Sequence, residues 1–163
     1  MKVRFVETMR GVLAAAGDSE WPVEFTISVE ATSVRRFLGG ERARSRGVIR
    51  AAPWAGEAVC DGELSLSLVP SQIRYRLSFL ADDGRTLTLA GHKSVSVRAL
   101  QRSMTTLPVE LSAAGGQVLA TGTLWFDLRE LGGFLRSFSS LADRERQALD
   151  ASRVALLRRS LDA

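Results

Sequence analysis

Residues 73–97, IRYRLSFLADDGRTLTLAGHKSVSV, have the pattern of an antiparallel β-hairpin. Apolar and polar side chains alternate along both arms, as expected for strands that turn one face to a core. The apolar positions are Ile73, Tyr75, Leu77, Phe79, Leu87, Leu89, Val95 and Val97. The positions between them hold mainly arginine, serine and threonine, so the pattern predicts a mainly β protein with an apolar inner face.

The length of the turn decides how the two arms pair. A two-residue loop, Asp83-Gly84, would set the apolar face of one arm against the polar face of the other. A three-residue loop over residues 82–84, with Gly84 in the left-handed conformation, instead pairs Phe79 with Leu87. We therefore predict the three-residue loop, because both apolar faces then agree.

This register also orients the less usual residues of the hairpin. Tyr75 lies opposite Gly91, and Lys93 lies opposite Ile73 on the core side. His92, the single histidine, points outward, which does not suit the water-excluded active site of a Ser-His-Asp or Cys-His mechanism. We predict no catalytic residue from this pattern.

A second charged residue falls on an inward face in the first predicted strand, residues 3–9. Glu7 shares that face with Met9 by simple alternation. A lone buried charge is costly, so one interpretation is that Glu7 and Lys93 meet inside the protein or at its opening. The other is that Lys93 extends to the rim while Glu7 pairs with a nearby arginine.

The first interpretation predicts a polar anchor in an apolar cavity. Its candidate ligand-binding residues are Lys93, Glu7, Tyr75 and Gly91. The partner that such a site suits is a lipophilic small molecule.

Further segments with strand-like alternation, separated by Gly and Pro, indicate the rest of the fold. They are residues 3–9, 23–29, 45–51, 64–68, 107–111 and 118–126. About eight short antiparallel strands are typical of a lipocalin-like barrel or a sandwich. A short helix is expected near residues 33–38, and C-terminal helices are expected from the spacing of Leu128, Leu131, Leu135 and Phe138 and from residues 141–161.

The length of 163 residues suits a single domain. We expect a β-rich core with a packing helix over residues 3–138 and a helical tail over residues 141–161. That tail could pack on the core, on a partner enzyme or on a second copy of the chain.

Composition narrows the function further. Cys60 is the single cysteine, so no internal disulfide forms, and one cysteine with one histidine cannot build an ordinary zinc site. No glycine-rich dinucleotide fingerprint or P-loop occurs, so no metal or nucleotide cofactor is expected. With no apolar run long enough for a signal peptide or a transmembrane helix, we expect a cytoplasmic protein.

The chain is basic, with a net charge of +4 and a pI near 10.2. Its arginines between residues 35 and 50 are interrupted by apolar, small and acidic residues. The outward faces carry serine and threonine instead of interleaved aromatic residues, so a nucleic-acid partner is not expected.

Four short motifs occur in an order that resembles a known domain. They are Phe5-Val-Glu-Thr-Met-Arg-Gly11, Gly91-His-Lys93, Thr105-Thr-Leu-Pro-Val109 and Gly122-Thr-Leu124, with Phe134 downstream. Over residues 3–138 the chain resembles the β-rich accessory domain that accompanies bacterial flavin-dependent oxidoreductases of the glucose-methanol-choline type, notably cholesterol-oxidase-like proteins. The resemblance implies a setting in lipid or sterol metabolism. It implies no oxidase activity, because the flavin and the chemistry belong to another domain there and no catalytic residue carries over.

Three functions follow as hypotheses. The first is a non-enzymatic domain that binds a lipid-like or sterol-like molecule, or that supports an enzyme handling one. The second is an isomerase or hydrolase of a lipophilic substrate that uses an inward Glu7 as base. The third is a scaffold that docks on a partner through residues 141–161.

Overall fold

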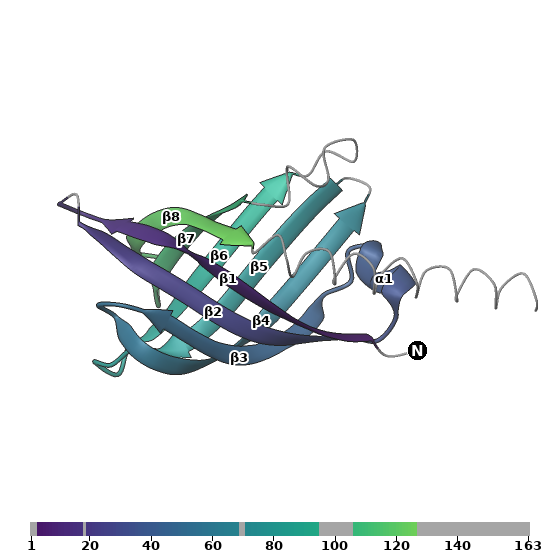
Figure 1. The fold of residues 1–163 in the computed structure, drawn as a ribbon, viewed down its shortest axis with the longest axis horizontal. Helices are drawn as coiled ribbons and strands as arrows, with labels where there is room; N and C mark the ends of the chain where they lie inside the picture. The colour runs from purple at the N-terminus through teal and green to yellow at the C-terminus, as the bar shows by residue number, and fades with distance from the viewer. Residues whose placement is uncertain (1–2, 18, 69–70, 95–105, 127–163) are drawn as a thin grey trace, which may run out of the picture.

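The computed structural model describes residues 3–17, 19–68, 71–94 and 106–126, which form eight strands and one short helix. The strands are β1 (Val3–Ala15), β2 (Glu20–Ala31), β3 (Ala43–Ala51), β4 (Ala55–Leu68), β5 (Ser71–Leu80), β6 (Thr86–Ser94), β7 (Thr106–Ala113) and β8 (Val118–Phe126). Each strand pairs antiparallel with the next and β8 returns to β1, which closes the sheet (Figure 1). The predicted mainly β fold is confirmed, and of the two predicted architectures the chain adopts the barrel.

The two ends of the barrel differ in their connections. Short turns join the strands after Ala15, Ala51, Leu80 and Ala113, and we call this the turn end. At the opposite end β1 begins, β8 finishes and β2 runs into α1 (Val34–Leu38), so we call it the helix end. No described helix is long and apolar enough to cross a membrane.

The central hairpin adopts the predicted register. Phe79 pairs with Leu87, and Lys93 lies opposite Ile73. The loop is the three-residue one, with Gly84 at a φ of 85°. Both apolar faces therefore point into the barrel, while Val95 and Val97 lie outside the described residues.

The helix predicted near residues 33–38 is confirmed as α1. The Ser33 side chain caps it by accepting a hydrogen bond from the backbone N–H of Arg36 at 3.5 Å. Phe37 is buried, and its ring centroid lies 5.9 Å from that of Phe5 on β1. The helix thus covers part of the helix end, whereas the helices predicted beyond residue 127 lie outside the described residues.

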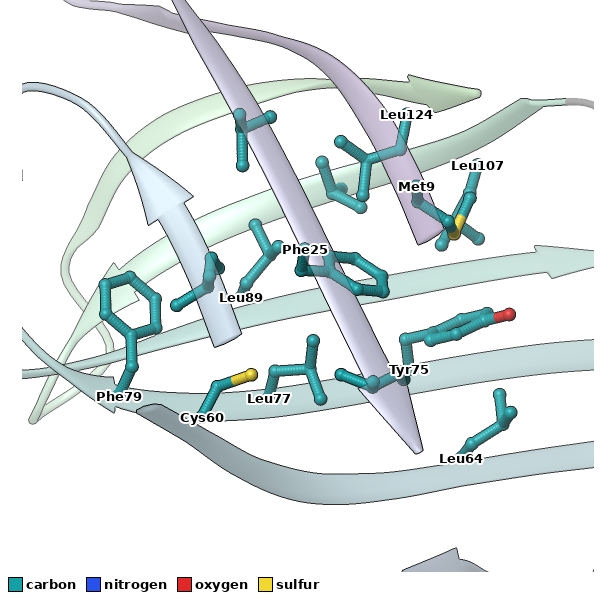
Figure 2. Close-up of a cluster of buried hydrophobic side chains, with 14 of the residues drawn as sticks. Met9, Phe25, Cys60, Leu64, Tyr75, Leu77, Phe79, Leu89, Leu107 and Leu124 are labelled. Atoms are coloured by element: carbon teal, nitrogen blue, oxygen red, sulfur yellow. The ribbon is translucent and has the colours of Figure 1, made fainter. Parts of the chain in front are cut away.

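Much of the barrel interior is solid. Met9, Leu13, Ile27, Ile49, Leu87, Leu111 and Leu124 expose none of their surface (Figure 2 labels Met9 and Leu124). A void that could hold water would leave exposed surface on the side chains around it. An eight-stranded barrel is just narrow enough for its side chains to fill it, and here they do so around these residues.

Glycines let neighbouring strands approach closely where the sheet bends. A Cβ at Gly62 on β4 would overlap the carbonyl oxygen of Arg76 on β5, and one at Gly47 on β3 would overlap that of Thr26 on β2. These contacts are with backbone, which cannot move aside as a flexible side chain can. The close approach of these strands therefore depends on glycine at the two positions.

We expect Gly62→Ala to lower the free energy of unfolding by about 1–3 kcal/mol, because the added methyl group must displace the β5 backbone. Gly56→Ala is the matched control on the same strand, since its Cβ would meet only the Asp82 carboxylate at 3.9 Å. Urea denaturation followed by circular dichroism measures both values. Equal stability of the two variants would contradict the role assigned to Gly62.

The outer face of β1–β4 alternates in charge from strand to strand. Arginines on β1 and β3 face acids on β2 and β4, in the ion pairs Arg4–Glu30, Arg10–Glu24, Arg46–Asp61 and Arg50–Glu57. Each exposed pair contributes little stability on its own, up to about 1 kcal/mol. All four pairs form only in the observed strand register. They therefore favour the same register that the apolar inner face requires.

Candidate functional site

Glu7 is the charged residue that the structure places inside the barrel. It lies on β1 opposite Ile27 of β2, and only 3% of its surface is exposed. The neighbouring inward positions on the same strand are Phe5 and Met9, both buried. The inward orientation predicted from alternation is confirmed.

Tyr75 on β5 reaches across the interior to this carboxylate. Its hydroxyl donates a hydrogen bond to Glu7 Oε2 over 3.1 Å. The ring of Phe25 from β2 packs beside the Tyr75 ring, with centroids 6.1 Å apart. Figure 2 shows the Tyr75 hydroxyl directed away from Cys60, Leu77 and Phe79. A buried carboxyl group and a buried phenol therefore meet inside the barrel, where Ser45 is another buried polar residue.

The environment of Tyr75 keeps its hydroxyl protonated. Burial raises the pKa of the phenol well above its ordinary value of 10.0, and the charge of Glu7 and the hydrogen bond to Glu7 raise it further. At neutral pH the hydroxyl is thus the hydrogen-bond donor, and Glu7 Oε2 is the acceptor. We call Glu7 and Tyr75 the polar pair.

Lys93 does not join the polar pair. Its ammonium group donates hydrogen bonds to the backbone carbonyl oxygen of Thr106 at 2.7 Å and to the Thr106 hydroxyl at 3.0 Å. Of the two interpretations, the one in which Glu7 meets Lys93 is therefore not what the structure has: Lys93 contacts Thr106, and Glu7 accepts from Tyr75. Lys93 is half-buried, as the alternative of extension toward the rim anticipated.

The contact with Thr106 also joins two strands near the helix end. The register of β6 and β7 runs from Leu87 opposite Ala113 to Gly91 opposite Val109. The described backbone pairing of β6 with β7 ends at Gly91 and Val109. Closer to the helix end, the Lys93 side chain on β6 contacts Thr106, the first residue of β7. Its position therefore supports a structural role in holding the two strands together.

Gly91 serves packing at its position opposite Tyr75. A Cβ there would lie 2.7 Å from Leu107 Cδ2 and 3.0 Å from Val109 Cγ1. Its lack of a side chain lets these two β7 residues lie close against β6. Of the four candidate residues, Glu7 and Tyr75 are joined by a hydrogen bond between their side chains. Tyr75 and Gly91 are neighbours because they are register partners on β5 and β6.

Exposure of the inward side chains rises toward the helix end. Phe5 and Leu66 each keep 9% of their surface exposed and Ile73 keeps 6%. At the turn end, Leu87 and Leu111 keep none. The difference is small, because Phe79 and Ala81 at the turn end keep 3% and 4% of their surface and Val29 at the helix end keeps none.

A hollow lined mainly by outward-facing residues of β4–β8 is a second candidate site. This open groove has a volume of about 1580 Å³ and is lined by Arg74, Arg76, His92 and Glu110 among others, and its lining includes the candidate residues Tyr75 and Gly91. His92 is exposed, as predicted. Arg74 already donates to Gln72 at 3.0 Å, and the groove mixes both signs of charge, so the buried polar pair is the better-defined candidate site.

Other chemistry-bearing residues offer less. Cys60 is fully buried, and burial raises the pKa of its thiol to about 11, which leaves it as a neutral thiol at physiological pH. The described residues contain no group of three His, Cys, Asp or Glu side chains that could hold a metal ion. Trp125 is 46% exposed and lies outside the interior.

Sequence reasoning identified Glu7, Tyr75 and Lys93 but not the role of Thr106. Alternation predicts which face of a strand a side chain lies on, but it does not predict where a strand begins. Thr106 is the first residue of β7, and no sequence pattern marks it as such. Comparison with known proteins adds no further residue, since no family model, curated protein or solved structure matches this chain.

The buried phenol leads to a spectroscopic prediction. Tyr75 is the single tyrosine, so tyrosinate absorbance at 295 nm reports on this residue alone. In the folded protein we expect no tyrosinate signal at pH values near 10, where the tyrosine of urea-unfolded chain ionises. A folded-state titration midpoint near 10 would contradict the buried polar pair.

The same shift makes stability depend on alkaline pH. The folded state favours the protonated phenol, so the unfolded chain loses this proton first as pH rises past about 10, and the free energy of unfolding falls. Tyr75→Phe should remove this part of the decline. The part due to Cys60, whose pKa is raised from 9.0 to about 11, should remain in that variant.

Proposed function

We propose that the barrel binds a small, largely apolar molecule from its helix end and holds the polar group of that molecule at Glu7 and Tyr75. The observation that carries the proposal is a buried carboxylate hydrogen-bonded to a buried phenol within an apolar interior. Eight-stranded antiparallel barrels are a fold compatible with small-molecule binding.

The chemistry of the polar pair favours one class of ligand. A carboxylate accepts hydrogen bonds, so it complements a ligand hydroxyl and repels a ligand carboxylate. Lys93, which could have received an acidic head group, already donates to Thr106. A sterol-like alcohol therefore suits the site better than a fatty acid does.

The resemblance to an accessory domain of cholesterol-oxidase-like proteins is consistent with such a ligand. In that setting the barrel would present or retain a sterol-like molecule for a partner enzyme that carries out the chemistry. Docking through residues 141–161 stays a prediction, because that segment lies outside the described residues.

The first experiment is native mass spectrometry of gently purified full-length protein, followed by organic extraction. We expect a passenger with a hydroxyl group at stoichiometric amount. Titration with the fluorescent sterol dehydroergosterol and with cis-parinaric acid, a fatty acid, then tests the preference. Absence of a passenger together with no binding of either probe would refute the proposal, and preference for the fatty acid would refute the role of Glu7.

Tyr75→Phe should weaken dehydroergosterol binding by roughly tenfold, because it removes one buried hydroxyl worth about 1–2 kcal/mol. Cys60→Ala is the control, since it also shortens a buried side chain but lies away from the Tyr75 hydroxyl (Figure 2). Unchanged binding in Tyr75→Phe, or equal weakening in both variants, would exclude Tyr75 from the ligand site.

A second function is favoured by the same hydrogen bond. A carboxylate beside a phenol can act as a general base for an isomerase or hydrolase of a lipophilic substrate. Under this alternative, Glu7→Gln should abolish turnover of a β,γ-unsaturated steroid ketone or a p-nitrophenyl acyl ester while the circular dichroism spectrum is retained. Lack of turnover by the wild-type protein on both substrates would remove the support for this alternative.

A further inference from the structure

Three exposed aliphatic side chains lie side by side on the outer face of the barrel. Val48 on β3, Val59 on β4 and Leu80 on β5 expose 39%, 58% and 60% of their surface. Val48 is the register partner of Val59. Phe79 on β5 is the register partner of Cys60 on β4. Because the two strands are antiparallel, the next residue of β5, Leu80, lies beside Val59, the residue before Cys60. We call these three residues the aliphatic row.

Ion pairs border the aliphatic row on both sides. Arg50 and Glu57 lie on the side of the turn end, with Arg50 Nη2 and Glu57 Oε2 2.8 Å apart. Arg46 and Asp61 lie on the other side, with Arg46 Nε and Asp61 Oδ1 3.4 Å apart. In both pairs the arginine is on β3 and the acid is on β4. The face is therefore positive along one strand and negative along its neighbour.

We propose that this face binds the same face of a second copy of the chain. The two-fold axis would run parallel to the strands, between β3 and β4. Rotation about this axis lays β3 of each copy over β4 of the other without shifting either strand along its length. Val48 then meets Val59, Arg46 meets Asp61 and Arg50 meets Glu57 across the interface.

The charges select this arrangement over the other simple two-fold contact. An axis in the same plane but perpendicular to the strands would lay β3 over β3, so Arg46 would meet Arg50. Asp61 would meet Glu57 in the same way, and like charges placed together oppose association. The strand-parallel axis converts each of these repulsions into an attraction.

A second copy is the partner that this pattern fits. A two-fold contact requires a surface that complements itself, and opposite charges on either side of the β3–β4 boundary satisfy that requirement. Val48 and Val59 supply apolar contact at the centre, Leu80 of each copy lies over β2 of the other at the level of Thr26, and the exposed ion pairs form the polar rim. Two sheets packed face to face in near alignment would bury the row.

The oligomeric mass of the full chain tests the interface. Sedimentation equilibrium should give twice the chain mass of 17.7 kDa. Val59→Arg places a cation opposite Val48 and between Arg46 and Arg50 of the other copy, so it should raise the dimer dissociation constant roughly 100-fold. Val118→Arg is the control, because Val118 is an exposed valine on β8 and lies outside this face.

Charge exchange tests the orientation of the two copies. Arg46→Asp and Asp61→Arg should each weaken the dimer, and the double variant should restore it because each new residue again meets its opposite charge. Circular dichroism confirms that each variant is folded. A monomeric wild-type protein, an unchanged dimer in Val59→Arg, or no restoration in the double variant would overturn the proposal.

Discussion

Closure of the barrel depends on the close contact between its first and last strands. β1 and β8 pair from Met9 opposite Phe126 to Ala15 opposite Ala120. A Cβ at Gly11 would overlap the carbonyl oxygen of Thr123, and one at Gly122 would overlap that of Val12. Two glycines on facing strands thus permit the backbone approach that removes both free edges of the sheet. The interior, the polar pair and the outer ion pairs all depend on the closed sheet. The pairing of β1 with β8, the seam of the barrel, completes that sheet.

The polar pair is an exception to the apolar interior. Burying a carboxylate is unfavourable, and the hydrogen bond from Tyr75 offsets part of that cost. Apolar residues at both positions would satisfy the packing of the barrel without it. The chain nevertheless has a buried carboxyl group and a buried phenol near the helix end of its core. Such an arrangement is expected when ligand binding, and not stability alone, determines the two residues.

Alternation predicted the fold because β-strand geometry is local. The inward positions of Glu7 and Tyr75 and the pairing of Phe79 with Leu87 follow from a period of two residues and from the requirement that apolar faces agree. That logic also placed Lys93 and His92 on their correct faces. The short helix expected near residues 33–38 is likewise present as α1.

The partners of the inward charges could not be predicted in this way. Whether Glu7 meets Tyr75 or Lys93 depends on the distance across the barrel and on where β7 begins, which are set by the whole ring. Lys93 contacts Thr106 because β7 starts near its side chain, and residue 106 carries no pattern that marks a strand end. Closure into a barrel instead of a sandwich likewise depends on the seam between residues about a hundred positions apart.

The unequal ends of the barrel have a practical consequence for attaching other molecules. The chain enters β1 and leaves β8 at the helix end, so a protein fused before Val3 or after Phe126 would be joined beside the route to the polar pair. The turn at residues 81–85 lies at the far end, with Asp83 and Gly84 exposed. A fluorescent label or a surface tether placed in that turn would leave the helix end unobstructed, whereas one joined directly before Val3 or after Phe126 would not.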